Sequence, residues 1–159
     1  MKTVCYNFVH YMYRPKEDQI FWNFLFSALF TVVLATAMWI LYRAQGGFPS
    51  SVPVFDAVLM SFAAFRITRL IIYDKITLWF RNFFPEGGGL RGTICDLLAC
   101  PWCVGFWGAL AVSWFYFMFP WAWYVILFLA LAGIGSLLQV TANLIGWKAE
   151  QLKRTTERL

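Results

Sequence analysis

The chain has 159 residues, of which 61% are apolar, 21% aromatic and only 13% charged. An average soluble protein is about 45–50% apolar and about 25% charged, so this chain has too few polar groups to cover a water-exposed surface. The composition therefore excludes an ordinary soluble enzyme, a disordered chain, a collagen and a small disulfide-rich fold, and it predicts a single all-α integral membrane domain. The net charge of +5 comes from basic residues that lie between apolar runs, so we expect contact with the lipid bilayer and none with nucleic acid.

The first membrane-spanning helix is predicted over residues 20–42, after a polar N-terminal segment at residues 1–19. It carries no charge, and at about 1.5 Å rise per residue it crosses a hydrocarbon core of about 30 Å. Trp22 and Trp39 lie near its two ends, where the amphipathic indole ring favours the membrane interface. The run is too long for the apolar part of a signal peptide, so we expect an uncleaved span.

A second span is predicted over residues 54–73. On a helical wheel extended to residue 81, nearly every charge falls on one stripe, which includes Arg66, Arg69 and Asp74. Two interpretations remain open. Either residues 54–73 cross the bilayer with this stripe turned toward partner helices and an interfacial amphipathic segment follows, or the whole segment lies in the interface. An arginine at bilayer depth costs about 2.5–3.5 kcal/mol unless it is paired or reaches the headgroups.

The two arginines of this second span have two possible roles. In the structural interpretation, which we favour, they reach lipid headgroups or pair with Asp56 or Asp96 and so fix the helices together. In the functional interpretation, Arg66 and Arg69 line a path for water or ions.

The remaining elements follow proline and glycine breaks. Residues 74–101 are expected to form a cytoplasmic loop with an interfacial helix, residues 102–119 a third span, and residues 121–147 a fourth span with tryptophan at both ends. Residues 148–159 form a basic, helix-prone tail. Four spans place ten basic residues on one side and only Arg43 on the other, so the positive-inside rule puts both termini in the cytoplasm.

Motifs in the middle of the chain resemble those of a known family. They occur in the order Phe65-Arg-Ile-Thr-Arg-Leu70, Asp74, Arg81, Leu97-Leu-Ala-Cys-Pro-Trp-Cys103, Gly105 and Trp107. Together they resemble the small bacterial and phage membrane proteins grouped as domain of unknown function 1360, over residues 54–119 of this chain. The resemblance implies a membrane architecture and a bacterial or phage origin, hence the bacterial inner membrane, but it implies no activity.

The pair Cys100 and Cys103 has two chemical interpretations. A redox dithiol would use the positive end of the following helix to stabilise a thiolate, but the predicted topology places the pair in the reducing cytoplasm. A zinc site needs about four ligands, and Cys95 with either Cys5 or His10 would have to complete it.

A structural interpretation of the same motif is the one that we favour. Cys100-Pro101-Trp102-Cys103 is then a tight turn at the start of a helix, whose thiols pack against Trp102 and Trp107. A single C-x-x-C pair is weak evidence for either redox chemistry or a metal. We therefore expect no metal and no cofactor.

Small and polar residues form one line along the fourth predicted span. They recur every three to four positions: Ala132, Ser136, Gln139, Asn143 and Gly146. In lipid, small residues let helices approach closely and amide side chains hydrogen-bond across the contact, so the line predicts packing within or between subunits. A polar pore face is the alternative. Gly133 and Gly135 beside the line would permit a bend.

These patterns lead to one functional hypothesis and two alternatives. The charged and amide side chains are too polar for lipid and a chain of this size has little interior, so we expect a homo-oligomer that is pore-like or scaffold-like. We expect it to be encoded by a phage or prophage and to act on the bacterial envelope in lysis, exclusion, defence or genome entry. The residues expected to face the oligomer or pore are Arg66, Arg69, Asp74, Ser136, Gln139 and Asn143.

The first alternative is a membrane thiol oxidoreductase that uses Cys100 and Cys103. The second is a membrane-anchored interaction module whose basic tail binds a protein partner on the cytoplasmic side. The sequence carries no nucleophile elbow, phosphate-binding loop or zinc-protease motif, so we do not expect an enzyme of another kind.

Overall fold

The computed structural model describes residues 16–47, 51–82 and 89–156, and in these ranges the chain forms helices and no strand. The elements are α1 (Lys16–Gln45), α2 (Val54–Ile72), the short 3₁₀ helix η2 (Lys75–Thr77), α3 (Leu78–Asn82), α4 (Gly89–Ala99), α5 (Pro101–Met118) and α6 (Ala122–Thr156). The all-α prediction is therefore confirmed for the described residues. Expectations for residues 1–15, 83–88 and 157–159, including those for Cys5 and His10, lie outside them.

Proline residues set several of the helix boundaries. α2 follows Pro53, whose carbonyl accepts the backbone N–H of Ala57 at 3.0 Å. α5 starts at Pro101, which suits a first turn because the N–H that it lacks would have no partner there. α6 begins two residues after Pro120 and includes both the predicted fourth span and most of the predicted tail. The tail is thus continuous with the last span in one helix of 35 residues.

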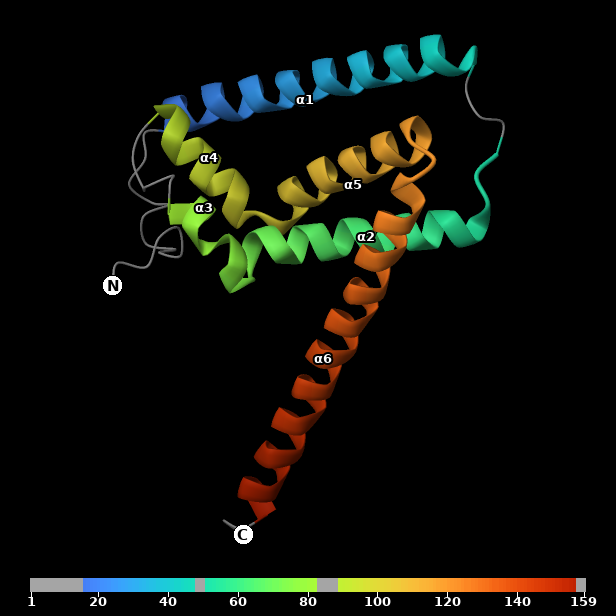
Figure 1. Ribbon diagram of the computed structural model, residues 1–159. Coiled ribbons are helices and arrows are strands. Elements are labelled where there is room, and N and C mark those ends of the chain that lie inside the picture. Colours follow the sequence, from blue (N-terminus) through green and yellow to red (C-terminus); the bar gives the residue numbers. More distant parts are fainter. Residues whose placement is uncertain (1–15, 48–50, 83–88, 157–159) are drawn as a thin grey trace.

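Helices α1, α5 and α2 lie side by side with α5 in the middle; α1 and α5 run in the same direction and α2 runs in the opposite one (Figure 1). The segment formed by η2, α3 and α4 lies at the end where α1 begins. α6 crosses α2, and the C-terminal half of α6 extends away from the rest of the described chain. α2 contacts both α5 and α6, whereas α1 contacts α4 and α5.

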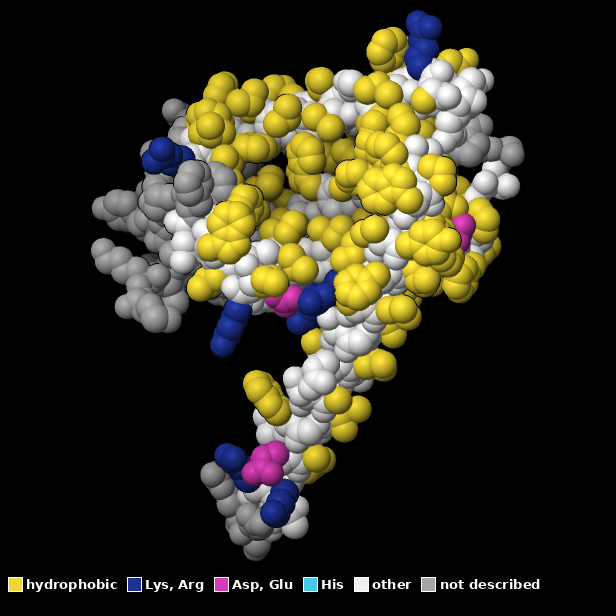
Figure 2. All heavy atoms as spheres, viewed as in Figure 1, with side chains coloured by type: hydrophobic (Ala, Val, Ile, Leu, Met, Phe, Trp, Pro, Cys, Tyr) yellow, Lys and Arg dark blue, Asp and Glu magenta, His cyan; other side chains and the backbone are white. Residues whose placement is uncertain are grey.

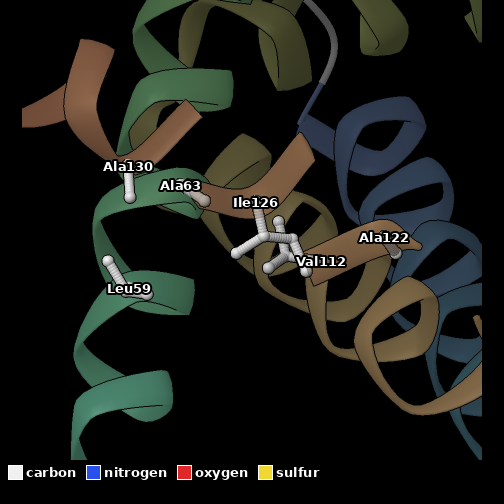
Figure 3. Packing of buried hydrophobic residues seen from close by; sticks show 6 residues of the cluster. All are labelled: Leu59, Ala63, Val112, Ala122, Ile126 and Ala130. Carbon is white, nitrogen blue, oxygen red and sulfur yellow. The ribbon is translucent and has the colours of Figure 1, made fainter. Parts of the chain in front are cut away.

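The buried core lies where α2 contacts α5 and α6. Its side chains are mostly short: Leu59 and Ala63 of α2, Val112 of α5, and Ala122, Ile126 and Ala130 of α6 (Figure 3). Ala63 and Ala130 have no exposed surface. Short side chains let the helix backbones approach closely, which is how helices associate in lipid, where burial from water supplies no driving force.

One glycine, Gly133, sets how closely α6 approaches α2. A Cβ atom built on Gly133 of α6 would lie 2.5 Å from the carbonyl oxygen of Phe62 in α2. A Cβ atom on Gly108 of α5 would lie 3.5 Å from the carbonyl oxygen of Ala64, which is an ordinary contact. The structure therefore gives Gly133 a packing role, whereas the sequence suggested a site for bending.

Two helices in the described part of the chain are long and apolar enough to cross a membrane: α1 from Ile20 onward, and α6. α4 and α5, which meet at an angle of 85°, would make a third if the pair is one broken span. The four predicted spans are thus not confirmed. α2 has the length of a span, but it is not among the candidates, and it carries Asp56, Arg66 and Arg69.

Large apolar side chains cover the outside of α1 and the exposed faces of α6 (Figure 2). Phe24 of α1 is 72% exposed and Phe128 of α6 is 71% exposed. Exposed apolar patches of this extent mark surfaces that contact membranes or other proteins. The described surface is therefore suited to lipid or to a partner helix.

Gly133 provides a direct test of the close contact between α2 and α6. Gly133→Ala is expected to lower the free energy of unfolding by about 1–3 kcal/mol, because the added methyl group must push two backbones apart. The matched control is Gly135→Ala, whose Cβ meets nothing within 4 Å and which should be neutral or stabilising because alanine favours a helix. Unfolding in mixed detergent micelles measures both. Equal stability of the two variants would contradict the packing role.

Candidate functional site

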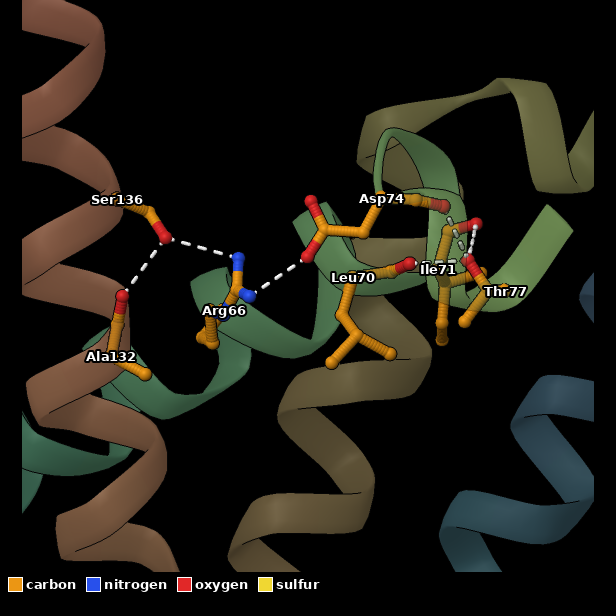
Figure 4. Close-up of polar contacts among 7 residues, drawn as sticks. All are labelled: Arg66, Leu70, Ile71, Asp74, Thr77, Ala132 and Ser136. Carbon is orange, nitrogen blue, oxygen red and sulfur yellow. Dashed lines mark hydrogen bonds and ion pairs between the residues drawn. The ribbon is translucent and has the colours of Figure 1, made fainter.

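Arg66 links three parts of the chain. Its Nη1 donates a hydrogen bond to the Ser136 hydroxyl of α6 at 3.0 Å, and its Nη2 lies 2.8 Å from Oδ2 of Asp74 (Figure 4). The Ser136 hydroxyl in turn donates to the carbonyl of Ala132 at 2.9 Å. The side chains of Arg66 and Asp74 are only 22% and 29% exposed. The guanidinium therefore connects α2, α6 and the segment that follows α2.

The turn after α2 places Asp74 beside Arg66. α2 ends at Ile72, and the backbone N–H groups of Tyr73 and Asp74 both donate to the carbonyl of Arg69. The Thr77 hydroxyl then donates back to the carbonyl of Leu70 at 2.5 Å (Figure 4). The helical wheel placed Arg66 and Asp74 on one stripe by assuming an unbroken helix. The structure brings them together by a turn instead.

Arg69 lies one turn beyond Arg66 but makes a different kind of contact. Its guanidinium carbon lies 5.2 Å from the ring centre of Tyr73 and 5.9 Å from that of Phe65, so the cation rests on aromatic faces. Its Nε atom is buried and has no hydrogen-bond partner in the described part of the chain. Of the two predicted arginines, Arg66 forms the polar link between helices.

Asp56 belongs to a second polar cluster that the sequence analysis missed. Its Oδ2 accepts a hydrogen bond from the Tyr116 hydroxyl at 2.5 Å, and its Oδ1 accepts one from Nε1 of Trp123 at 3.3 Å. These contacts join the start of α2 to the end of α5 and the start of α6. The predicted pairing of Asp56 with an arginine is therefore wrong, since Arg66 pairs with Asp74. The sequence does contain a signal for this cluster, namely a carboxylate in an apolar run and aromatic hydrogen-bond donors at the ends of two later helices.

The predicted polar line on α6 divides into two parts. Ser136 contacts Arg66, whereas Nε2 of Gln139 donates to Oδ1 of Asn143 at 3.2 Å within the helix. Every residue from 137 to 156 is exposed. The two amide side chains therefore lie on a part of α6 that packs against no other described helix.

Cys100 and Cys103 form a close pair at the start of α5. Cys100 is the N-cap residue, and its sulfur accepts the backbone N–H of Cys103 at 3.3 Å. The two Sγ atoms are 2.8 Å apart, and both thiols are free and partly exposed. Between them, Pro101 and Trp102 face outward.

Trp102 and Trp107, which the sequence predicts to cover these thiols, are placed differently from each other. Trp102 is 82% exposed, so it does not pack over them as predicted. Trp107 makes an edge-to-face contact with Phe30 of α1, with ring centres 5.0 Å apart, and so ties α5 to α1. Among the described residues, Cys95 does not join the pair in any group that could hold a metal ion.

Comparison with known proteins identifies a family and a relative. The family described as protein of unknown function (DUF1360) matches residues 59–87 and 85–142, which together span more than half of the chain. Sporulation protein YjcA of Bacillus subtilis strain 168 is 33% identical over 105 residues, a match that covers 54% of this chain and 89% of the relative. No solved structure matches the chain significantly. The resemblance inferred from the motifs is confirmed.

The link between Arg66 and Asp74 is expected to stabilise the fold as a coupled pair. A double-mutant cycle of Arg66→Gln and Asp74→Asn should give a coupling energy of about 1 kcal/mol or more, because both groups are largely screened from solvent. The control is the pair Arg154 and Glu150, whose side chains are 69% and 56% exposed and whose coupling should be about 0.3–0.5 kcal/mol. Unfolding in mixed micelles gives both values, and equal coupling would refute the structural importance of the Arg66 link.

Proposed function

This chain belongs to the DUF1360 family of proteins of unknown function, and from its structure we propose that it is a multi-pass membrane protein that works as a self-associating scaffold. The family description carries no activity. The relative in Bacillus subtilis is called a sporulation protein, so we place the scaffold in spore formation. The expected origin in a phage or prophage has no support in these matches, and we do not retain it.

The observation that carries this proposal is the C-terminal half of α6. Residues 137–147 are apolar apart from a few polar side chains, and all of them are exposed on a helix that extends away from the rest of the described chain (Figure 1). In the described part of a single chain, this end of α6 is exposed along its whole length. A second copy supplies a surface of the same composition, and helix pairs of this kind close into symmetric dimers.

The amide side chains favour a second copy over lipid as the neighbour of this segment. At about 1.5 Å per residue, Gln139 lies about 7 Å from the middle of the apolar run at residues 122–147, well inside a hydrocarbon core about 30 Å thick. Gln139 and Asn143 form one hydrogen bond with each other, which leaves further amide hydrogens and oxygens to be satisfied. In hydrocarbon an unsatisfied polar group costs several kcal/mol, whereas the amides of a second copy supply both donors and acceptors.

The contacts within the chain favour a scaffold over a pore. Of the residues expected to face a pore, Arg66 binds both Asp74 and Ser136 inside the chain, and Arg69 rests on aromatic rings. The groups left to face a neighbour are the two amides of α6. A helix pair joined by two amides needs no water-filled channel.

The proposed location is the bacterial inner membrane with both termini in the cytoplasm. Along the chain, α2 runs opposite to α1, and α5 runs in the direction of α1 again. This arrangement supports the topology, because it brings the segment with Lys75 and Arg91 to the end where α1 begins. Arg43 lies near the opposite end of α1. The exposed end of α6, which carries Lys148, Lys153 and Arg154, remains the predicted site for a cytoplasmic protein partner.

The scaffold proposal predicts how the particle mass responds to changes on α6. The wild-type chain should form dimers or larger particles in mild detergent. The double change Gln139→Leu and Asn143→Leu should weaken association roughly tenfold, because amide hydrogen bonds between membrane helices contribute about 0.6–2 kcal/mol each. Thr141→Leu, on the opposite face of the same exposed turns, is the matched control and should leave the mass unchanged. Light scattering measures the mass, and a strictly monomeric wild type would defeat the proposal.

The cellular part of the proposal has a separate test. Removing the gene in a spore-forming host should lower the number of heat-resistant spores without slowing vegetative growth, and the wild-type gene should restore the number. The Gln139→Leu and Asn143→Leu double variant should fail to restore it. An unchanged spore count after deletion argues against a role in spore formation.

A further inference from the structure

We propose that Cys100 and Cys103 form a redox-active dithiol, which exchanges with the disulfide of another molecule. This activity goes beyond the scaffold role and does not depend on it. The two thiols lie at the bend of 85° between α4 and α5, whereas the proposed contact between copies lies on the far half of α6.

The distance between the two sulfurs is the first argument. They are 2.8 Å apart, while a disulfide bond is about 2.05 Å long. The difference is within reach of small side-chain rotations, since both residues lie in one turn at the start of the same helix. Oxidation of the pair therefore requires no rearrangement of α4 or α5.

The two thiols have different surroundings, which assigns them different roles. Cys100 occupies the N-cap of α5, where the backbone N–H of Cys103 points at its sulfur and the positive end of the helix dipole favours negative charge. The Cys103 thiol donates to the same sulfur. This geometry assigns Cys100 as the attacking sulfur and Cys103 as the resolving thiol.

The turn is open to an incoming molecule. Pro101 and Trp102, which separate the two cysteines, are exposed, and Trp102 is 82% exposed. Both thiols are themselves partly exposed. By contrast, Cys95 is 4% exposed within α4 and does not share this surface. A protein disulfide or glutathione disulfide can therefore approach Cys100 beside the outward-facing indole ring.

The proposed reaction is thiol–disulfide exchange in two steps. The Cys100 thiolate attacks one sulfur of the incoming disulfide, so that a mixed disulfide forms and the other sulfur leaves as a thiolate. Cys103 then loses its proton and attacks the Cys100 sulfur, which forms the Cys100–Cys103 disulfide and releases the second thiolate. The chain gives up two electrons and the protons of its two thiols, and the incoming disulfide is reduced to two thiols.

The test uses the purified full-length chain in detergent with glutathione disulfide as the probe. In the wild type, both thiols should become resistant to alkylation, and the peptide that contains them should lose two hydrogen atoms and keep no glutathione. Cys103→Ser should accumulate glutathione on Cys100, because the resolving thiol is missing. Cys100→Ser is the matched control, with one thiol left in the same turn, and should accumulate far less adduct.

Peptide mass spectrometry reads all three results, and the thermal unfolding midpoint checks that each variant is folded. The proposal is overturned if both wild-type thiols stay fully alkylatable at glutathione disulfide concentrations that oxidise a free dithiol peptide of the same sequence. It is also overturned if the two single variants gain equal amounts of glutathione. The wild-type result tests the dithiol proposal even if a variant fails to fold. It does not depend on the particle mass, which tests the scaffold proposal separately.

Discussion

An arginine inside an apolar helix has to find partners, and this constraint governs how α2 meets α6. Arg66 reaches Ser136 because the two helices lie very close together, and it reaches Asp74 through the turn that follows α2. Gly133 permits that approach, since it lies against the backbone of Phe62 just before Ser136 comes level with Arg66. Close packing and the polar link therefore depend on each other. A bulkier residue at the glycine would both separate the backbones and move the hydroxyl away from the guanidinium.

The sequence was enough to locate the main helices, because their boundaries follow from local chemistry. Uncharged runs, prolines and tryptophans placed α1, α2, α5 and the apolar part of α6 within a few residues of their observed limits. The number of membrane-spanning helices could not be predicted from the same local signals. α2 has the period and length of a spanning helix, but two of its three charges, Asp56 and Arg66, bind side chains of other helices, and periodicity cannot reveal such contacts.

The candidate site was predictable in its residues and not in its contacts. The helical wheel put Arg66 and Asp74 on one stripe but did not predict that they pair, because it could not reveal that Thr77 folds the chain back onto the end of α2. The cluster around Asp56 was missed because its donors, Tyr116 and Trp123, come from helices more than fifty residues later. Hydrogen bonds within one helical turn can be predicted from the spacing of residues in the sequence. Hydrogen bonds between distant helices can be predicted only when it is known how the helices pack.

The polar groups of this chain are of two kinds, those that fix the fold and those that remain available to other molecules. Asp56 and Arg66 satisfy their charges within the chain, and so they hold α2 in place. Gln139 and Asn143 on α6, and the thiols of Cys100 and Cys103, lie outside these two clusters and are exposed or partly exposed. The first turns of α5 rest on α2 through Gly105 and Gly108, which face Thr68. The turn with the two thiols is thus carried by a helix that packs against α2, while Pro101 and Trp102 on its outer surface stay exposed.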